Sequence, residues 1–199
     1  MCNHLEVVDT IELDDVTVNI YQDSTDESPR EWDNLGTMAC FHRRYTLGDK
    51  TDFTADELIE FLSDNLDKII ALPLYLYDHS GLSMSWSDRG YPFNDQWDAG
   101  QVGFIYVTYE KLQSEYHWKH ITKARKAKIV QYLKNEVETY DQYLTGDVYG
   151  FEVVCNLCND ALDSCWGFYG HNWKDNGLLD YAKDNRCNCK ERLEMALEV

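Results

Sequence analysis

The sequence predicts an α+β fold, one domain over residues 1–199 with a mixed or antiparallel sheet, two long helices and a C-terminal helix. A length of 199 residues fits one domain. Hydrophobic residues make up 44% and aromatic residues 14% of the chain, which indicates a packed core rather than disorder. The predicted strands and helices interleave without a regular βαβ period, which favours a mixed or antiparallel sheet.

In the first third of the chain, two strands precede a helix. Residues 16–21 alternate β-branched and polar side chains, which predicts a half-buried strand, and residues 38–42 predict a short buried strand. Thr54 with Glu57 three residues later matches a capping box, which predicts a helix beginning there. The apolar residues expected on one face of this helix are Leu58, Phe61, Leu62, Leu66 and Ile69.

The rest of the chain predicts a hairpin, further strands and three helices. Residues 72–77 and 82–86 flank a turn at residues 78–81 that ends in glycine, a hairpin pattern. A strand at 102–107 leads into a helix near Tyr109, and apolar spacing predicts a long helix over about 121–144. Strands at 148–154 and 164–169 are expected to pair, and a final helix is expected at 186–197.

Acidic residues dominate the charge of this chain. The net charge is −18, and residues 1–70 alone contain 17 acidic and 5 basic residues. Such a field repels nucleic acid and anionic membranes and attracts basic protein surfaces. The alternative is that acidity only maintains solubility. Residues 117–128 form the one basic run and could contact phosphates. Nucleic-acid-binding domains are normally basic over a whole face, so direct nucleic-acid binding is not expected of this acidic chain.

No targeting or membrane segment is evident. The first residues lack the basic and apolar pattern of a secretory signal. The longest apolar run, residues 69–77, is interrupted by Pro73 and is shorter than the about 20 residues needed to span a bilayer. A cytoplasmic location without membrane partners is therefore expected.

Four of the seven cysteines occur as two close pairs, Cys155 with Cys158 and Cys187 with Cys189. Four thiols suffice for a tetrahedral zinc site, but ligand pairs usually have two to four residues between them and the second pair has one. The first pair also follows a predicted strand, where alternate residues face opposite sides. We therefore expect free, partly buried thiols with no metal or cofactor, and these four cysteines are only weak candidates for ligands.

An enzyme is the alternative to a binding protein. Glycine-anchored polar turns could present Asp33, His42, Asp78 and His79 to a cleft as a small hydrolytic or metal-dependent site. Convergence of these residues with Asp147 in one pocket favours an enzyme, and dispersal favours a binding protein. No standard phosphate-binding, nucleophile-elbow or zinc-protease motif is present.

Several long segments resemble a family of uncharacterised phage and mobile-element proteins. They are SPREWDNLGTMACFHRRY at residues 28–45, YLYDHSG at 75–81, WDAGQVG at 97–103, ETYDQYLTGDVYGF at 138–151 and DSCWGFYG at 163–170. The resemblance transfers no catalytic residue and implies a phage-encoded protein that acts in the bacterial cytoplasm.

In that context the acidity suggests a counter-defence inhibitor, of the anti-CRISPR or antirestriction kind. Such a protein would mimic DNA and bind the basic, nucleic-acid-binding surface of a host defence protein through its acidic N-terminal region. The carboxylates expected to bind this partner are Asp23, Asp26, Glu27, Asp56, Glu60, Asp64 and Asp67. A virion or assembly component, forming a homo-oligomer through an aromatic interface, is a third possibility.

Overall fold

The structure, a computed structural model, describes residues 6–25, 27–88, 90, 92–93, 97–183 and 185–189. Its contacts divide the chain into two compact units. Unit 1 comprises Met1–Asp26 and Gly146–Val199, and unit 2 comprises Glu27–Thr145. The α+β class is confirmed, and both sheets are antiparallel. The organisation as one domain stays a prediction.

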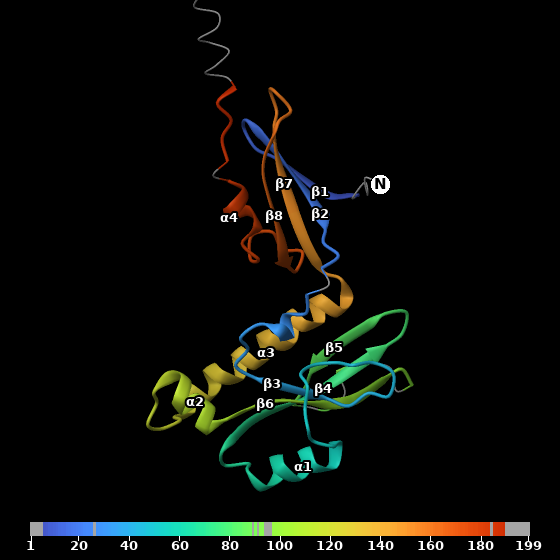
Figure 1. Cartoon of the computed structure of the whole chain (residues 1–199), viewed down its shortest axis with the longest axis vertical. Coiled ribbons are helices and arrows are strands. Elements are labelled where there is room, and N and C mark those ends of the chain that lie inside the picture. Colours follow the sequence, from blue (N-terminus) through green and yellow to red (C-terminus); the bar gives the residue numbers. More distant parts are fainter. Residues whose placement is uncertain are drawn as a thin grey trace, which may run out of the picture. The chain divides into compact units, whose positions relative to one another are not determined.

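Unit 1 is a four-stranded sheet with one short helix. In the order β1-β2-β7-β8 it contains β1 (Val7–Glu12), β2 (Val16–Gln22), β7 (Val148–Cys155) and β8 (Ala161–Tyr169), followed by α4 (Leu178–Ala182) (Figure 1). Strand β2 pairs with β7, and the whole of unit 2, residues 27–145, lies between these two strands in the sequence. The sheet of unit 1 is therefore built from both ends of the chain.

The core of unit 1 lies on one face of its sheet. Val18 pairs with Val153 and Ile20 with Phe151, which places all four side chains on the same buried face. Leu178 of α4 is fully buried against them. The apolar residues of β2 therefore face the core and the polar residues face away, which confirms the half-buried strand that the sequence predicts.

Unit 2 has a four-stranded sheet between helices. The strand order β3-β6-β4-β5 uses β3 (Thr37–Cys40), β4 (Ile69–Asp78), β5 (Leu82–Trp86) and β6 (Ala99–Thr108). Around it lie the 3-10 helix η1 (Pro29–Glu31) and the α-helices α1 (Ala55–Asp64), α2 (Tyr109–Tyr116) and α3 (Lys123–Thr145) (Figure 1). The predicted hairpin and the long helix are confirmed as β4–β5 and α3.

Helices α3 and α1 cover opposite faces of the unit 2 sheet. Leu133 and Val137 of α3 are buried in one cluster with Ile105 of β6. Leu58 of α1 is buried in another cluster with Tyr106, the next residue of β6. Because neighbouring strand residues point to opposite faces, the sheet separates two hydrophobic cores.

The capping box of α1 is present, but the helix is shorter than its apolar pattern predicts. The Thr54 side chain accepts a hydrogen bond from the backbone of Glu57, and the Glu57 carboxylate accepts one from the backbone of Thr54. The helix ends at Asp64, so the prediction that Leu66 and Ile69 share its buried face is wrong. Leu66 is exposed, and Ile69 begins β4.

Two other predictions differ from what is observed at the chain ends. Strand β1 has no counterpart among the predicted elements, because its mostly exposed residues provide no apolar periodicity. The predicted helix at 186–197 lies largely outside the described residues, and residues 186–188 are not helical.

A buried arginine links three separated segments of unit 2. The Arg30 side chain is only 4% exposed. Its Nε and Nη2 donate to the two carboxylate oxygens of Asp49 at 2.8 and 2.7 Å, and Nη1 donates to Glu136 of α3 at 2.9 Å. Burial alone would lower the pKa of Arg30, but hydrogen bonds to both carboxylates raise it. The guanidinium is therefore charged and fully paired.

The first testable prediction concerns this arginine. Replacing it (R30A) leaves two carboxylates without their cation and should reduce the free energy of unfolding by about 3–5 kcal/mol. Urea denaturation followed by circular dichroism measures the change. The control R43A, at an exposed arginine, should stay within about 0.5 kcal/mol of wild type. Equal stabilities of the two variants would contradict the structural role of Arg30.

Candidate metal centre

Four cysteines of unit 1 form one compact cluster. The sulfur atoms of Cys155, Cys158, Cys187 and Cys189 all lie within 4.8 Å of one another. The closest pairs are Cys155 with Cys189 at 3.4 Å and Cys158 with Cys187 at 3.6 Å. Sulfurs that bind zinc tetrahedrally, with Zn–S bonds of about 2.3 Å, lie about 3.8 Å apart. The cluster therefore has the dimensions of a four-thiolate zinc site.

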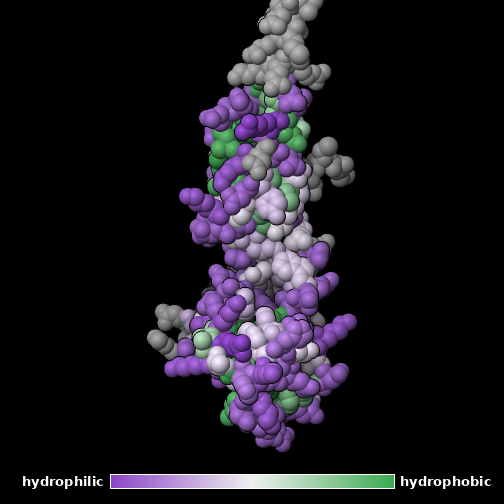
Figure 2. All heavy atoms as spheres, turned by 90° about the vertical axis from the view of Figure 1, so that its left-hand side faces the viewer, coloured by the Kyte–Doolittle hydropathy of each residue, from purple (hydrophilic) through white to green (hydrophobic). Residues whose placement is uncertain are grey.

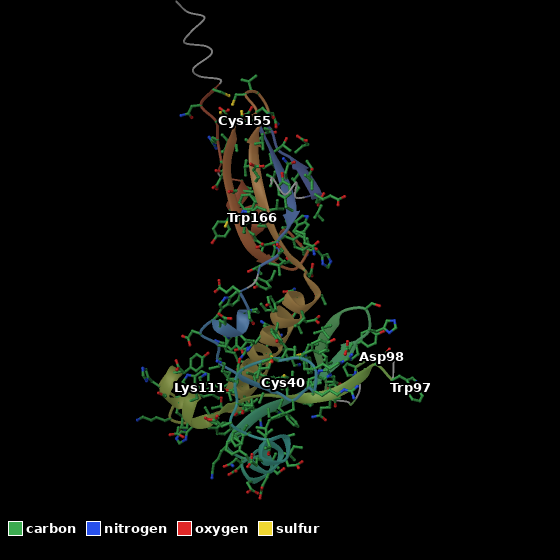
Figure 3. All side chains as sticks on the ribbon, turned by 45° about the vertical axis from the view of Figure 1, so that its right-hand side comes forward. Cys40, Trp97, Asp98, Lys111, Cys155 and Trp166 are labelled. Carbon is green, nitrogen blue, oxygen red and sulfur yellow. The ribbon has the colours of Figure 1, made fainter. Side chains whose placement is uncertain are left out.

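The turn between β7 and β8 positions the first two cysteines. Cys155 is the last residue of β7 and is buried, whereas Cys158 lies in the turn beyond it (Figure 3). The turn closes through a hydrogen bond from the Asn159 backbone to the Cys155 carbonyl at 2.9 Å, and Asn159 adopts a positive φ of 60°. Because the chain reverses between the two cysteines, strand alternation does not separate their side chains.

Backbone N–H groups surround the sulfurs. Those of Cys158 and Leu157 donate to the Cys155 sulfur and lower the pKa of its thiol to about 6. The backbone N–H of Cys189 donates to the Cys187 sulfur at 3.4 Å. Hydrogen bonding to Cys187 and burial raise the pKa of Cys189 to about 11. The donors to Cys155 therefore stabilise the thiolate, which is the form that binds metal. At Cys158 a backbone donor is outweighed by burial and by hydrogen bonds from neighbouring thiols, which raise the pKa of this thiol and favour its neutral form.

Asn156 attaches the cysteine turn to the neighbouring β1–β2 connection. Its backbone donates to the Asp15 carbonyl at 3.0 Å, and its side-chain carbonyl accepts from the Thr17 hydroxyl at 2.6 Å. The same connection lines a recess of about 830 Å³ beside the cysteines, together with Lys183 and Arg186. The turn is therefore held on two sides before any metal binds.

The spacing that argued against a shared site does not prevent the four cysteines from meeting in one cluster, and the expectation of free thiols without a metal stays a prediction. The segment of Cys187 and Cys189 lies outside any regular strand in the described residues, so a single intervening residue does not direct the two side chains to opposite faces. Across the described residues, no other group of three or more histidine, cysteine or acidic side chains offers ligand atoms to a common metal ion.

Comparisons with protein-family models, with curated proteins and with solved structures find no match for this chain. Among the described residues, no helix is both long and apolar enough to cross a membrane.

The predicted catalytic residues lie in more than one place. In unit 2, the His42 ring stacks on Tyr45, whose hydroxyl donates to Asp78 at 3.3 Å, while Arg44 forms an ion pair with Asp78. The Nδ1 of His79 instead lies 2.7 Å from the Asp98 carboxylate.

Asp33 does not join this group, because it lines a separate recess of unit 2 with Tyr116 and Tyr132. Asp147 belongs to unit 1. Within unit 2, the candidate catalytic residues are therefore distributed over more than one site.

The predicted partner-binding acids also divide between the units. Asp23 belongs to unit 1, where its carboxylate accepts from the Gly167 backbone at 3.1 Å. Glu27 is exposed in unit 2, and Asp26 lies outside the described residues. The remaining acids are exposed on or just beyond α1, and they are Asp56, Glu60, Asp64 and Asp67.

Our second testable prediction concerns Cys40, which sequence places beside His42. Burial and the Asp49 carboxylate raise the pKa of the Cys40 thiol to about 12. At pH 8 only about one molecule in ten thousand would carry the reactive thiolate. Mass spectrometry after iodoacetamide treatment should find Cys40 unmodified in the folded protein and modified in urea. Alkylation of Cys40 in folded protein at the rate of the half-buried Cys165 would contradict this assignment.

Proposed function

We propose that this chain is a zinc-binding protein whose four-cysteine cluster in unit 1 is a structural metal centre. The observation that carries the proposal is the mutual approach of four sulfur atoms to within 4.8 Å. Four sulfur ligands in tetrahedral arrangement suit Zn²⁺, and a site with four protein ligands leaves no position for substrate. The site therefore stabilises structure and does not itself catalyse a reaction.

Two disulfides are the main chemical alternative for the same cysteines. A disulfide requires a sulfur–sulfur distance of about 2.05 Å, well below the 3.4 and 3.6 Å of the closest pairs. The four sulfurs also form one cluster instead of two isolated pairs. A metal explains both features, because it holds four thiolates at equal, non-bonded distances.

A metal in this cluster would connect two distant parts of unit 1. Cys155 and Cys158 belong to the β7–β8 turn, whereas Cys187 and Cys189 follow α4. Unit 1 otherwise has a thin core, with a single helix of five residues packed on its sheet. In small units of this kind, metal-binding free energy contributes directly to folding.

A second function, binding of a basic partner, is supported by the surface of α1. Asp56, Glu60 and Asp64 recur every four residues and are all exposed. Ile59 lies beside them on the same helix and is 51% exposed. Figure 2 shows mainly hydrophilic residues on the visible face of unit 2. An acidic stripe with an exposed apolar residue is the composition expected of a surface that meets a basic protein.

We extend this second proposal to counter-defence: the partner is a host defence protein, and the α1 stripe occupies its nucleic-acid-binding surface. The support is the resemblance to phage proteins, the net charge of −18, and the separation of Asp33 from the other candidate catalytic residues of unit 2. An enzyme around His42, Asp78 and His79 would lack Asp33, which lines a different recess.

The third testable prediction is stoichiometric zinc. Elemental analysis of protein purified without chelator should find about one zinc per chain, and the double variant C155S/C158S should lose it. Replacement of zinc by Co²⁺ should give the intense visible d–d bands of tetrahedral thiolate coordination. The control C40A/C165A removes two cysteines outside the cluster and should keep the metal.

Three results would count against the zinc proposal. Iron in place of zinc would change the identity of the metal. Two disulfides between the four cysteines in protein kept under reducing conditions, or full zinc retention by C155S/C158S, would remove the site altogether. Where zinc is present, chelation should lower the melting temperature of the wild type and leave that of C155S/C158S unchanged.

The fourth testable prediction concerns the acidic stripe. A partner captured from bacterial lysate should bind the wild type with an association rate that falls steeply as ionic strength rises from about 0.05 to 0.5 M, because the Debye length shortens from about 14 to 4 Å. The variant D56K/E60K/D64K should slow association further.

A matched variant separates local charge from total charge. E110K/E115K/E138K makes the same change in net charge at exposed acids of unit 2 that lie on α2 and α3 instead of α1. It should associate faster than D56K/E60K/D64K. Equal effects of the two triple variants would show that the stripe has no specific role, and insensitivity to salt would show that charge does not drive binding.

A further inference from the structure

A second recess, in unit 2, has aromatic walls and an acidic rim. Its volume is about 320 Å³, and it lies between η1 with its following turn, the end of α2 and the outer side of α3. The aromatic side chains that line it are Trp32, Tyr116 and Tyr132. Trp32 is 46% exposed and Tyr132 is 38% exposed, so a ligand can reach both rings from solvent.

Hydrogen bonds hold the walls of this recess in place. The Asn34 side chain donates to the carbonyls of Pro29 and Trp32 at 2.8 and 2.9 Å, which fixes the turn that carries Trp32. Glu136, on the α3 side, accepts from the Leu35 backbone at 2.9 Å and from Arg30 at 2.9 Å. The recess is therefore preformed, which reduces the entropy that a ligand loses on binding.

The chemistry of the lining favours a cation. Asp33 is exposed on the recess, Glu136 contributes a second carboxylate, and no lysine, arginine or histidine is among the described residues that line it. Aromatic faces attract cations, and the Nζ of Lys128 already lies 5.5 Å from the centre of the Tyr132 ring. Glu136 is paired with Arg30, and Lys111 Nζ donates to the Asn34 carbonyl at 2.9 Å. The exposed Asp33 is therefore the carboxylate of the recess that a ligand can reach.

We propose that this recess binds an arginine side chain of a basic protein partner. A volume of 320 Å³ is at the lower end of the roughly 300–1,000 Å³ of ligand pockets, which suits one side chain better than a cofactor. A guanidinium can stack on the rings and donate two hydrogen bonds to the Asp33 carboxylate at the same time. A lysine ammonium offers neither the flat face nor the paired donors.

The inference is independent of the zinc proposal, since the recess belongs to unit 2 and the cysteines to unit 1. It adds a specific contact to the proposed binding of a basic partner, and it rests on that proposal only for the source of the arginine. A small arginine compound tests the recess without any partner protein, so failure of one proposal can be distinguished from failure of the other.

The fifth testable prediction is therefore binding of Nα-acetyl-arginine amide by the full chain. In ¹H–¹⁵N NMR spectra, a millimolar titration should shift the Trp32 indole signal and the backbone amides of Leu35 and Gly36. Nα-acetyl-citrulline amide has nearly the same shape without the charge, and it should cause much smaller shifts. D33N should weaken the affinity about two- to fivefold, and W32A should have an effect of similar size.

The control is D56N, an exposed acid on α1, which should bind the arginine compound like wild type. Equal shifts with arginine and citrulline, or shifts that map away from the recess, would overturn the proposal. D33N removes only a charge at an exposed position, so its spectrum should otherwise overlay that of the wild type. An unchanged affinity of D33N would likewise overturn the role assigned to the carboxylate.

Discussion

The geometry of unit 2 depends on the buried guanidinium of Arg30. One flat cation joins η1 to Asp49, in the connection after β3, and to Glu136 in α3. Each carboxylate is also used a second time, since Asp49 accepts from the Met38 backbone at 2.8 Å and Glu136 from the Leu35 backbone. A buried charge of this kind is tolerated only when all its partners are in place, so the network favours one arrangement of three segments that are far apart in sequence. Two of these segments, η1 with its following turn and α3, also line the aromatic recess, so the network fixes two of its walls.

Among the described residues of unit 1, no buried ion pair like that of Arg30 is present. Both of its outer strands, β1 and β8, are largely exposed, and α4 buries little more than Leu178 and Ala182. The cysteine cluster lies at the end of this sheet where β7 turns into β8. A metal there would close the unit between two segments that hydrophobic contacts alone hold weakly. The two units therefore illustrate two solutions to the same problem, a buried ion network in one and a four-sulfur cluster in the other.

Local patterns predicted most elements, because helix caps, turns and strand alternation are short-range features. Thr54 and Glu57 identified the start of α1, and the glycine-ended turn at 78–81 identified the β4–β5 hairpin. The end of α1 was not predictable from periodicity, because Ile69 continues the apolar helical spacing while its backbone joins the sheet. The division into two sheets was also hidden, since β2 pairs with a strand more than a hundred residues later in the chain. The approach of the four cysteines was hidden for a related reason: ligand spacing describes residues close together in sequence, whereas Cys187 and Cys189 reach the β7–β8 turn from a separate segment that follows α4.

The acidic residues of the N-terminal third are clustered in the sequence, but the fold does not gather them into one unit. Residues 1–70 contribute to both units, so their 17 acids are divided between two structural units. Asp23 is engaged with the backbone of Gly167 in unit 1, whereas Asp56, Glu60 and Asp64 share an exposed face of α1 in unit 2. Of the acids expected to bind a partner, only the α1 group combines exposure, regular spacing and a neighbouring apolar side chain. Unit 2 also carries the aromatic recess, whose rim holds Asp33. The acidic face of α1 and the recess both belong to unit 2, whereas the cysteine cluster belongs to unit 1, so the proposed partner surface and the proposed metal centre can be tested independently of each other.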